Sequence, residues 1–302
     1  MSGTFDLYKE VTQTILDHLE AGVVPWRKPW DAGGTPALPL RVTGEAYRGV
    51  NVVLLWQKMV AQGYRARTWM TYAQATKLGG QVRKGEKSTR VVKMGRHVTQ
   101  GAVDARTGER EEDEVRRFMR AYRVFHVEQI DGLDASFYAA PTPPRSFGTR
   151  SDPAVLAWLA RTGIALEVTG EPRAYYDIAR DVIHMPPAEN FGDGAGHAGT
   201  LLHEAAHATG HRTRLKRRFG TAFGDADYCQ EEVVAELGSA MVGAQLGVEP
   251  RFEQNAAYLE AWTRVLRSDA RAVMRAASAA QAASDWLIAR GGLLEDPALL
   301  AS

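Results

Sequence analysis

The segment TLLHEAAHATGH at residues 200–211 limits the folds open to this chain, because its histidines can act together only on a helix. Residues four apart on an α-helix project from nearly the same side, with Cβ atoms about 5–6 Å apart, so His203 and His207 can share one ion. Glu204 is offset by about 100° and would lie beside that ion, where its carboxylate can take a proton from activated water. This His-Glu-x-x-His pattern is typical of zinc hydrolases. The alternative is an amphipathic surface helix that happens to carry two histidines.

The neighbouring residues set the expected limits of this helix. Thr200 follows several glycines and is a candidate N-cap, and Gly210 is a candidate C-terminal stop. Catalytic zinc normally has three protein ligands and one open position. A metzincin would have its third histidine where this chain has Thr213, so that class is excluded. His211 would lie two turns from His203 on the same helix and is a weak alternative ligand.

The segment YCQEEVVAELGSAMVGAQLG at residues 228–247 offers a better third ligand. Its apolar residues recur at helical spacing, and Glu232 and Glu236 form a second stripe. As in the gluzincins, we expect Glu232 to be the third ligand and Glu236 to steady a ligand imidazole. Glu231 would point about 100° away and is the runner-up. A solvated acidic face is the alternative interpretation.

Charge divides the chain into two unlike parts. Residues 1–98 hold 15 Lys or Arg and 7 Asp or Glu, which gives 15 − 7 = +8, and the remainder carries 22 − 29 = −7. This asymmetry suggests that the first part meets a polyanion. The single cysteine, Cys229, cannot form an internal disulfide, so nothing indicates an oxidising compartment. Because the chain lacks a signal-peptide pattern and a long apolar run, we expect a soluble, cytoplasmic protein without a membrane partner.

Aromatic residues alternate with cations in the basic part. Flat rings stack on unpaired bases while Lys and Arg follow the phosphates, so this composition favours single-stranded DNA as a partner. The alternative is that the tryptophans are core anchors and the loop lysines are merely solvated. The candidate DNA-binding residues are Trp26, Arg27, Lys28, Trp30, Tyr47, Arg48, Asn51, Arg83, Lys84 and Lys87.

Periodicity and composition predict two domains, at residues 1–140 and 153–302, joined by a linker at 141–152 that is rich in proline and small polar residues. The strand directly before the histidine helix is expected to form the edge of the cleft. In chain order we expect helices at 5–21, 51–61 and 71–78, β-rich runs at 88–98 and 116–130, a helix from 153, two strands within 171–187, the histidine helix, a helix at 228–247, and a helical tail at 254–290 interrupted near Ser268.

Several segments spread along the chain are informative when taken together. They are FDLYKEVTQTILDHLEAGVVPWRKPW, VTGEAYRGVNVVLLW, LGGQVRKGEK, VIHMPP, LLHEAAHATGH, RLKRRFG, FGD, EEVVAELGSA and AWTRVLRSDARAVMRAASAAQ. In this order they resemble the ArdC-type antirestriction proteins, whose N-terminal domain also occurs in TraC-type plasmid primases, and the resemblance covers nearly the whole chain. It implies an α+β fold in which an N-terminal domain that binds single-stranded DNA precedes a mostly helical, zincin-like metallopeptidase domain with a small sheet. It also implies that the protein belongs to a conjugative plasmid or related element and protects incoming DNA from host restriction enzymes.

The resemblance also assigns roles to single residues. His203, His207 and Glu232 correspond to the ligands of one Zn²⁺ ion, although another divalent metal is an alternative. Glu204 corresponds to the catalytic glutamate. Three departures lie beside the expected cleft and bear on substrate preference more than on metal binding: they are Ala208, His197 and Ala198, at positions where the family usually has aromatic residues.

Three classes of function remain open. The first is a DNA-bound zinc metallopeptidase that acts on subunits of host restriction enzymes. The second is a DNA-binding protector whose metal domain is structural or recognises a protein without cutting it. The third, a metal-dependent nuclease, is least favoured, because nucleases more often use carboxylate-rich clusters of two metals. For peptide hydrolysis, the candidates for stabilising an oxyanion are Tyr175, Tyr176 and Tyr228.

Overall fold

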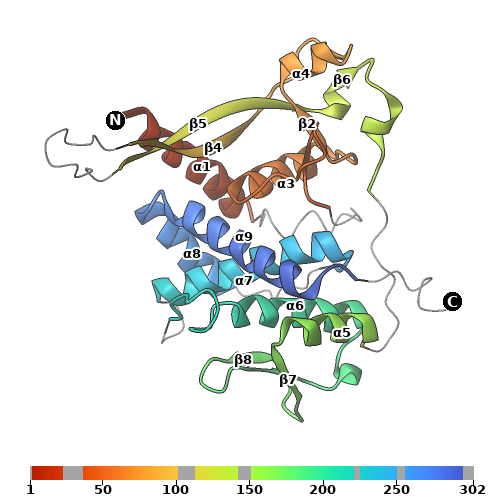
Figure 1. The fold of residues 1–302 in the computed structure, drawn as a ribbon, viewed down its shortest axis with the longest axis vertical. Coiled ribbons are helices and arrows are strands. Elements are labelled where there is room, and N and C mark those ends of the chain that lie inside the picture. The colour runs from red at the N-terminus through yellow and green to blue at the C-terminus, as the bar shows by residue number, and fades with distance from the viewer. Residues whose placement is uncertain are drawn as a thin grey trace, which may run out of the picture.

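The chain folds as an α+β structure whose layers are stacked along its long axis (Figure 1). The expected α+β class is therefore confirmed. We call residues 2–141 the N-terminal half and residues 151–294 the C-terminal half. In this computed structural model the described residues are 2–22, 37–100, 113–141, 151–220, 225–249 and 256–294. The expected linker falls mostly on residues 142–150, which lie outside the described residues.

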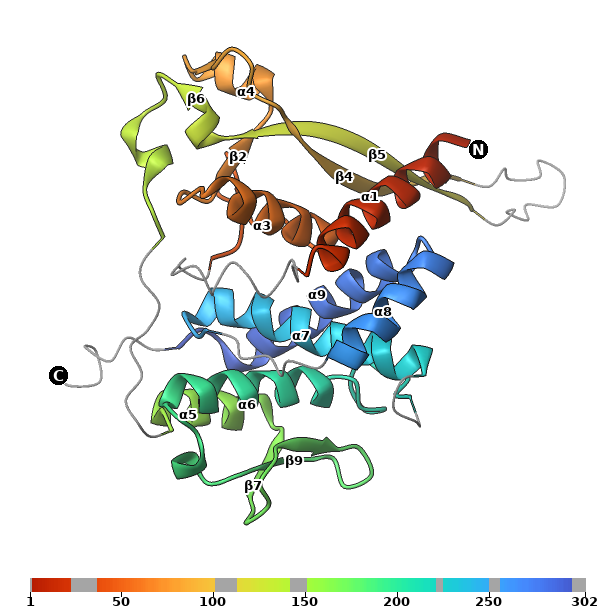
Figure 2. The same ribbon diagram turned by 180° about the vertical axis from the view of Figure 1, so that it is seen from behind.

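The N-terminal half places a sheet over two helices. The sheet has the order β1-β2-β5-β4, and its two longest strands pair antiparallel as a hairpin. Turned by 180°, the molecule shows α1 lying along this hairpin with α3 beside it (Figure 2). The elements are α1 (Ser2–Glu20), β1 (Leu40–Arg41), α3 (Val50–Gln62), β2 (Thr68–Met70), α4 (Tyr72–Lys77), β3 (Gln81–Val82), β4 (Thr89–Thr99), β5 (Glu114–His126), β6 (Ile130–Asp131) and the short 3₁₀ helices Val127–Gln129 and Ala135–Tyr138.

The C-terminal half is mostly helical and carries a small sheet at the far end of the molecule (Figure 1). Its helix α6 packs against α7 on one side and against the small sheet on the other. No helix among the described residues is both long enough and apolar enough to cross a membrane. The elements are α5 (Pro153–Thr162), β7 (Ala165–Val168), β8 (Tyr175–Asp177), β9 (Val182–Met185), the 3₁₀ helix Ala188–Asn190, α6 (Gly194–Ala208), α7 (Ala226–Leu246), α8 (Ala256–Ser268) and α9 (Ala272–Gly291).

A single hydrophobic cluster joins the two halves. It contains buried residues of α1, α3, β4 and β5 together with buried residues of α7, α8 and α9, including the tryptophans Trp56 and Trp262. The hydroxyl of Thr12 also donates a hydrogen bond of 2.8 Å to the carbonyl oxygen of Ala270. Because burial of apolar surface is the main stabilising term in folding, we expect the halves to stabilise each other.

The small sheet corrects one expectation from the sequence. Its order is β7-β9-β8, so β9, the strand that precedes the histidine helix, is central and every one of its residues is buried. The edge strand next to α6 is β8. The sequence pattern showed the two strands within 171–187 but not β7, which pairs parallel to β9 and forms the other edge.

The histidine helix also begins earlier than expected. Its N-cap is Asp193, whose carboxylate accepts a 2.6 Å hydrogen bond from the backbone N–H of Gly196, and Thr200 lies inside the helix. A glycine inside a helix costs only about 1 kcal/mol, which tertiary packing can offset. The packing is dense here, because Leu201 and Leu202 are fully buried in a second hydrophobic cluster.

Candidate metal centre

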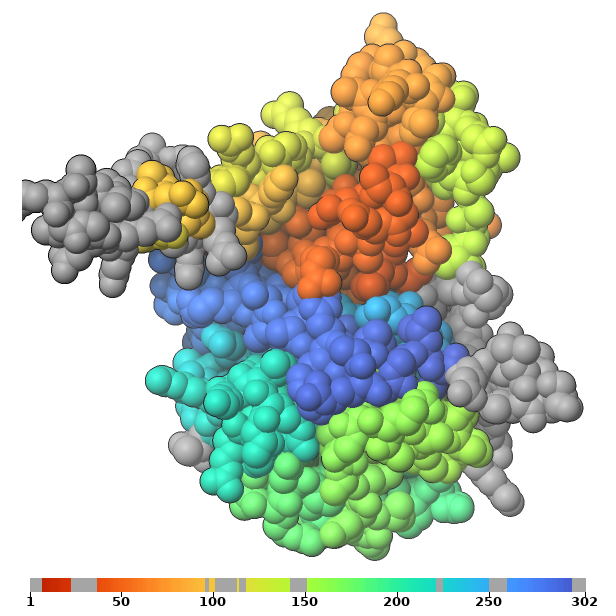
Figure 3. All heavy atoms as spheres, viewed as in Figure 1, coloured from red at the N-terminus to blue at the C-terminus, as the bar shows by residue number. Residues whose placement is uncertain are grey.

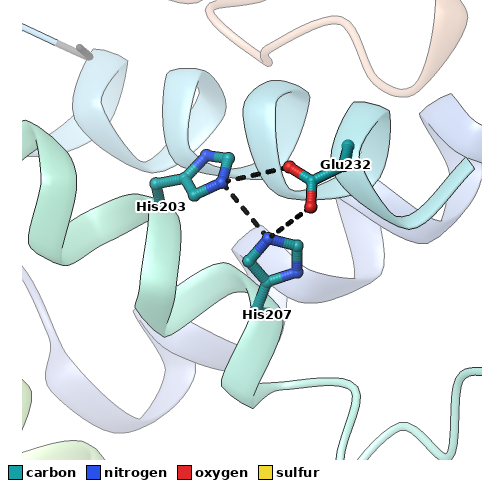
Figure 4. Close-up of side chains that lie close together, drawn as sticks. All are labelled: His203, His207 and Glu232. Carbon is teal, nitrogen blue, oxygen red and sulfur yellow. Dashed lines mark hydrogen bonds and ion pairs between the residues drawn. The ribbon is translucent and has the colours of Figure 1, made fainter. Parts of the chain in front are cut away.

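Two helices bring three potential metal ligands together (Figure 4). His203 and His207 come from α6, and Glu232 comes from α7, which packs against it. The Nε2 atoms of the two histidines are 3.2 Å apart. Glu232 places Oε2 3.6 Å from Nε2 of His203 and Oε1 3.7 Å from Nε2 of His207. The three residues predicted from the sequence to be ligands thus lie side by side in the structure.

These separations fit a single small cation. A tetrahedral ion with bonds of about 2.0–2.1 Å holds its ligand atoms about 3.3–3.4 Å apart, close to the spacings observed here. Two imidazoles and one carboxylate also form a donor set that leaves a fourth position open, as catalytic zinc sites do. Among the described residues, this cluster is the one group of His, Cys, Asp and Glu whose ligand atoms converge in this way.

Glu231 orients the ring of His207. Its Oε1 lies 3.1 Å from Nδ1 of that ring, and Arg217 donates hydrogen bonds of 2.8 Å and 2.9 Å to the two oxygens of Glu231. When Nδ1–H of His207 donates to this carboxylate, the neutral ring carries its lone pair on Nε2, facing the cluster.

The sequence pattern predicts that Glu236 makes this orienting contact and offers Glu231 only as an alternative third ligand. Glu236 is buried one turn further along α7, whereas the carboxylate on the ligand ring belongs to Glu231. His203 differs from His207, because its buried Nδ1 has no hydrogen-bond partner among the described residues.

The cluster is electrostatically coupled. Burial favours the neutral ring of His207, but contacts with Glu231 and Glu232 outweigh it and raise its pKa to about 10. Burial acts to raise the pKa of Glu232, yet its contacts with the two histidines lower that pKa well below the ordinary range. The pKa of Glu231 is also lowered, since hydrogen bonds from Arg217 and His207 outweigh its burial.

Glu204 directly follows His203 on α6 and is 8% exposed. Its offset of about 100° around the helix places it beside the ligand cluster rather than in it. It is not one of the three converging groups, which agrees with a role in proton transfer rather than in ligation.

The three tyrosines proposed to stabilise an oxyanion have different surroundings. The ring of Tyr176 lies 6.2 Å from that of Phe219, which in turn lies 6.3 Å from the ring of His207. The hydroxyl of Tyr176 donates a 2.7 Å hydrogen bond to Asp181. Burial, followed by this contact, raises its pKa above the ordinary value. Tyr175 instead stacks on His184 at 4.6 Å.

Tyr228 packs against the shared core, so Tyr176 is the tyrosine connected to the cluster through an aromatic ring. Phe219, which provides that connection, belongs to the RLKRRFG segment, but nothing in that segment alone indicates that its ring lies beside His207.

His211 and Cys229 lie outside the ligand cluster. Because α6 ends at Ala208, His211 is not on the same helix as assumed from the sequence, and its Nδ1 lies 3.4 Å from Asp181 and 2.8 Å from the hydroxyl of Thr213. Cys229 is buried in the shared core, and this burial raises the pKa of its thiol. The lone cysteine is thus a core residue.

Several candidate DNA-binding residues have structural contacts. Tyr47 is 7% exposed. The amide of Asn51 exchanges two hydrogen bonds of 2.8 Å with the backbone of Val92, which ties the start of α3 to β4. Arg83 donates to Glu86, Asp131 and the carbonyl oxygen of Glu128.

The other candidates are more accessible or outside the described residues. The exposed Arg48 forms an ion pair with Asp285 of α9, and Lys84 and Lys87 are exposed. The segment at 24–30, which supplies Trp26, Arg27, Lys28 and Trp30, lies outside the described residues.

Comparison with protein families divides the chain into two matched regions. Residues 5–125 match the N-terminal domain of the anti-restriction factor ArdC, and residues 153–279 match a zincin-like metallopeptidase family. The order of the two regions is the one expected from the sequence.

Individual relatives extend these matches along the chain. An uncharacterised protein, y4eC, of Sinorhizobium fredii is 38% identical over 291 residues, which cover 94% of this chain and 92% of the relative. A DNA primase TraC of Escherichia coli is 33% identical over 298 residues, which cover 93% of this chain but only 27% of the primase.

Two crystal structures of the antirestriction protein ArdC from the R388 plasmid are similar along nearly their full length. The metal-free structure has a TM-score of 0.82 at 44% identity and covers 96% of this chain and 100% of that one. The Mn(II)-bound structure has a TM-score of 0.79 at 43% identity and covers 95% of this chain and 98% of that one.

Proposed function

Because this chain belongs to the ArdC family of antirestriction proteins, we propose that it protects incoming DNA of mobile elements from host restriction enzymes. In this proposal the N-terminal half binds single-stranded DNA, and the C-terminal half is a metal-dependent peptidase that acts on a subunit of the restriction enzyme. The observation that carries the enzymatic part is the convergence of His203, His207 and Glu232 beside the buried Glu204.

We propose Zn²⁺ as the resident ion, because two imidazoles and one carboxylate are a common donor set of catalytic zinc. The Mn(II)-bound structure of the R388 relative makes other divalent ions reasonable candidates. A divalent ion held by these three residues supplies Lewis acidity toward a peptide carbonyl and toward water.

The side chains of this chain supply the remaining chemistry. The Glu204 carboxylate is the proposed general base, which takes a proton from water and passes it to the leaving amine. Glu231 fixes the ring of His207, and Arg217 fixes Glu231, so the ligand geometry is set before a substrate arrives. The edge strand β8 next to α6 is the proposed support for an extended peptide.

The charge distribution supports the nucleic-acid part of the proposal. The region that matches the N-terminal domain of ArdC overlaps the part of the chain with an excess of eight positive charges. A surface of this kind attracts a polyanion, and affinity then falls as salt concentration rises.

One observation favours a protector that does not cut protein. The hydroxyl of Tyr176, the tyrosine connected to the cluster, is engaged with Asp181, and Arg214 also binds Asp181 with two hydrogen bonds of 2.6 Å and 3.1 Å. If this network is retained with substrate present, Tyr176 cannot stabilise an oxyanion, which would weaken hydrolysis and favour a metal domain that recognises a protein without cutting it.

A restriction-protection assay tests the proposal. Unmodified plasmid DNA is transferred by conjugation into a restricting host that produces wild-type protein, Glu204→Gln, His203→Ala, or Glu260→Gln as an exposed control on α8. Metal content is measured by elemental analysis. We expect His203→Ala to lose both the metal and the protection. We expect Glu204→Gln to keep the metal but to lose the protection and the cleavage of restriction subunits. The control should match the wild type.

The outcomes separate the parts of the proposal. Full protection by Glu204→Gln with metal intact would show that hydrolysis is not required and would support the protector that does not cut protein. Absence of protection by the wild type in a host that restricts the DNA efficiently would contradict the antirestriction function itself.

A further inference from the structure

A groove of about 880 Å³ lies where the two halves meet. One wall is formed by the loop after β1, the start of α3 and the hairpin strands β4 and β5. The other wall is formed by α9 of the C-terminal half, through Met274, Ser278, Gln281 and Asp285 among others. The space-filling view shows this helix, in blue, directly against the N-terminal half, in orange (Figure 3). Each half supplies only one wall, so neither forms the groove alone.

One face of the hairpin continues the groove outward. Cα partners across the two strands are Val91 and Tyr122, Lys93 and Arg120, and Gly95 and Phe118. Partners in an antiparallel pair share a face, and alternate residues along a strand return to it, so these three pairs lie on one face. Val91, Lys93 and Tyr122 line the groove. The pair of Gly95 and Phe118 is therefore the next pair on this face, further from the groove.

The aromatic residues on this face are exposed, although they belong to strands that pair with each other along the length of β4. Tyr122 is 41% exposed and Phe118 is 37% exposed. The ring of Phe118 packs across the opposite strand at Gly95, where a Cβ atom would collide with it, and the guanidinium carbon of Arg120 lies 5.2 Å from the ring centroid. Tyr122 and Phe118 are four residues apart, or about 13 Å along the strand.

The same face also carries cations. Lys93 and Arg120 are exposed partners on it, one from each strand. In the groove the cations are Arg41, Arg48 and Lys93, and the acids are Glu45 and Asp285. Rings spaced along a cationic track suit single strands, because bases stack on the rings and phosphates follow the cations.

We propose that single-stranded DNA lies in the groove between the halves and along this hairpin face, with Tyr122 and Phe118 stacking on bases and Lys93 and Arg120 contacting phosphates. The inference rests on the proposed binding of single-stranded DNA and gives that binding a site. Neither aromatic residue was among the candidates drawn from the sequence.

The ion pair between Arg48 and Asp285 gives the C-terminal half a part in this binding. Nη1 of Arg48 lies 3.3 Å from Oδ1 of Asp285, and the second guanidinium nitrogen also contacts that carboxylate. Gln281 donates a 3.0 Å hydrogen bond to Asp285 and accepts one of 2.9 Å from the backbone N–H of Gly49. A phosphate entering the groove competes with Asp285 for Arg48 and is repelled by the free carboxylate. Asp285, which belongs to the C-terminal half, therefore weakens the binding of DNA to Arg48 in the N-terminal half.

The first test uses the full chain and a fluorescent oligothymidylate of about 15 nucleotides, with Kd measured by anisotropy at low salt. Phe118→Leu keeps an apolar side chain but removes the flat ring, and Tyr122→Leu does the same, so each should weaken binding by about 5- to 100-fold. Phe118→Trp keeps a ring and should retain the wild-type affinity or exceed it. Thermal unfolding of each variant confirms that it is folded.

The second test asks whether α9 participates. Asp285→Asn removes a negative charge and frees Arg48, so we expect binding to tighten by about three- to tenfold at low salt, with the gain shrinking as salt rises. Glu171→Gln makes the same change in charge in the loop between β7 and β8 and should change Kd by less than about twofold.

Either of two results overturns the inference. One is unchanged affinity in both leucine variants, and the other is unchanged or weaker binding by Asp285→Asn. If the wild type binds the oligonucleotide in either case, the proposed DNA binding stands and its site lies elsewhere. If the wild type does not bind, the proposed function fails together with the site.

Discussion

Replacing Glu231 by glutamine should weaken metal binding although this residue is not expected to touch the ion. In the structure Glu231 accepts three hydrogen bonds: one from Nδ1–H of His207 at 3.1 Å, and two from Arg217 at 2.8 Å and 2.9 Å. A glutamine has one oxygen and one NH₂ group in place of two accepting oxygens. Whichever way the amide turns, at least one donor of His207 or Arg217 then faces another donor.

Two consequences can be given magnitudes. A carboxylate that orients a ligand histidine typically contributes 10- to 100-fold to metal affinity, so we expect the Kd for Zn²⁺ to rise by about that factor, or about 1.4–2.7 kcal/mol. The side chain of Arg217 is 11% exposed and would lose its counter-charge, which should lower the free energy of unfolding by about 3 kcal/mol. The hydrogen bonds of Arg217 to Thr209 and to the carbonyl oxygen of Ala206 remain and limit this loss.

The assay is competition for Zn²⁺ with a chromophoric chelator, run on protein shown by circular dichroism to be folded. The matched control is Glu236→Gln, which makes the same chemical change in another buried acid one turn along α7. We expect the control to change the Kd for Zn²⁺ by less than about threefold. The reasoning is refuted if Glu231→Gln binds Zn²⁺ as the wild type does, or if Glu236→Gln loses as much affinity.

Two further predictions concern the fold. Burial lowers the pKa of His126 to about 4, and its neutral ring donates to the carbonyl oxygen of Ala66 and accepts from the N–H of Glu128. Below about pH 6.5 the unfolded chain therefore binds a proton at this histidine that the folded chain does not, so the free energy of unfolding should fall by about 3 kcal/mol between pH 6.5 and 4. An NMR titration of this ring near pH 6.5 in the folded protein would contradict the prediction. Gly291→Ala should lower the free energy of unfolding by about 1–3 kcal/mol, because its Cβ would collide with the indole of Trp158, whereas Gly170→Ala points into open space and serves as the control in chemical denaturation.

Much of the candidate metal site could be predicted from the sequence, because the site depends on the spacing of residues within single helices. His203 and His207 share a side of any helix that contains them, and the acids of α7 follow the same rule. Which acid meets which histidine depends instead on how two helices cross. That crossing places Glu232 at the open side of the histidines and Glu231 behind His207. Glu231 could have been recognised only by knowing that Arg217, from the loop after α6, binds it from the other side.

The candidate nucleic-acid surface depended still more on tertiary structure. The sequence pattern indicates that Tyr47 and Asn51 are exposed loop residues. In the structure Tyr47 is buried, and Asn51 connects α3 to β4 through hydrogen bonds with Val92. Phe118 and Tyr122 are four residues apart and share a face of any strand that contains both, but only the tertiary structure shows that this face is exposed. A one-residue shift of the hairpin register would have turned both rings together to the other face of the sheet.

By itself, the sequence determined the helices, the strands β4, β5, β8 and β9, the ligand types and the division of charge, because each of these follows from residues close together in the chain. The tertiary structure decided that β9 is central, that the two halves share a hydrophobic core, and that Glu231 rather than Glu236 orients His207. These features depend on contacts between residues far apart in the chain, and local periodicity contains no information about which distant side chain completes a contact.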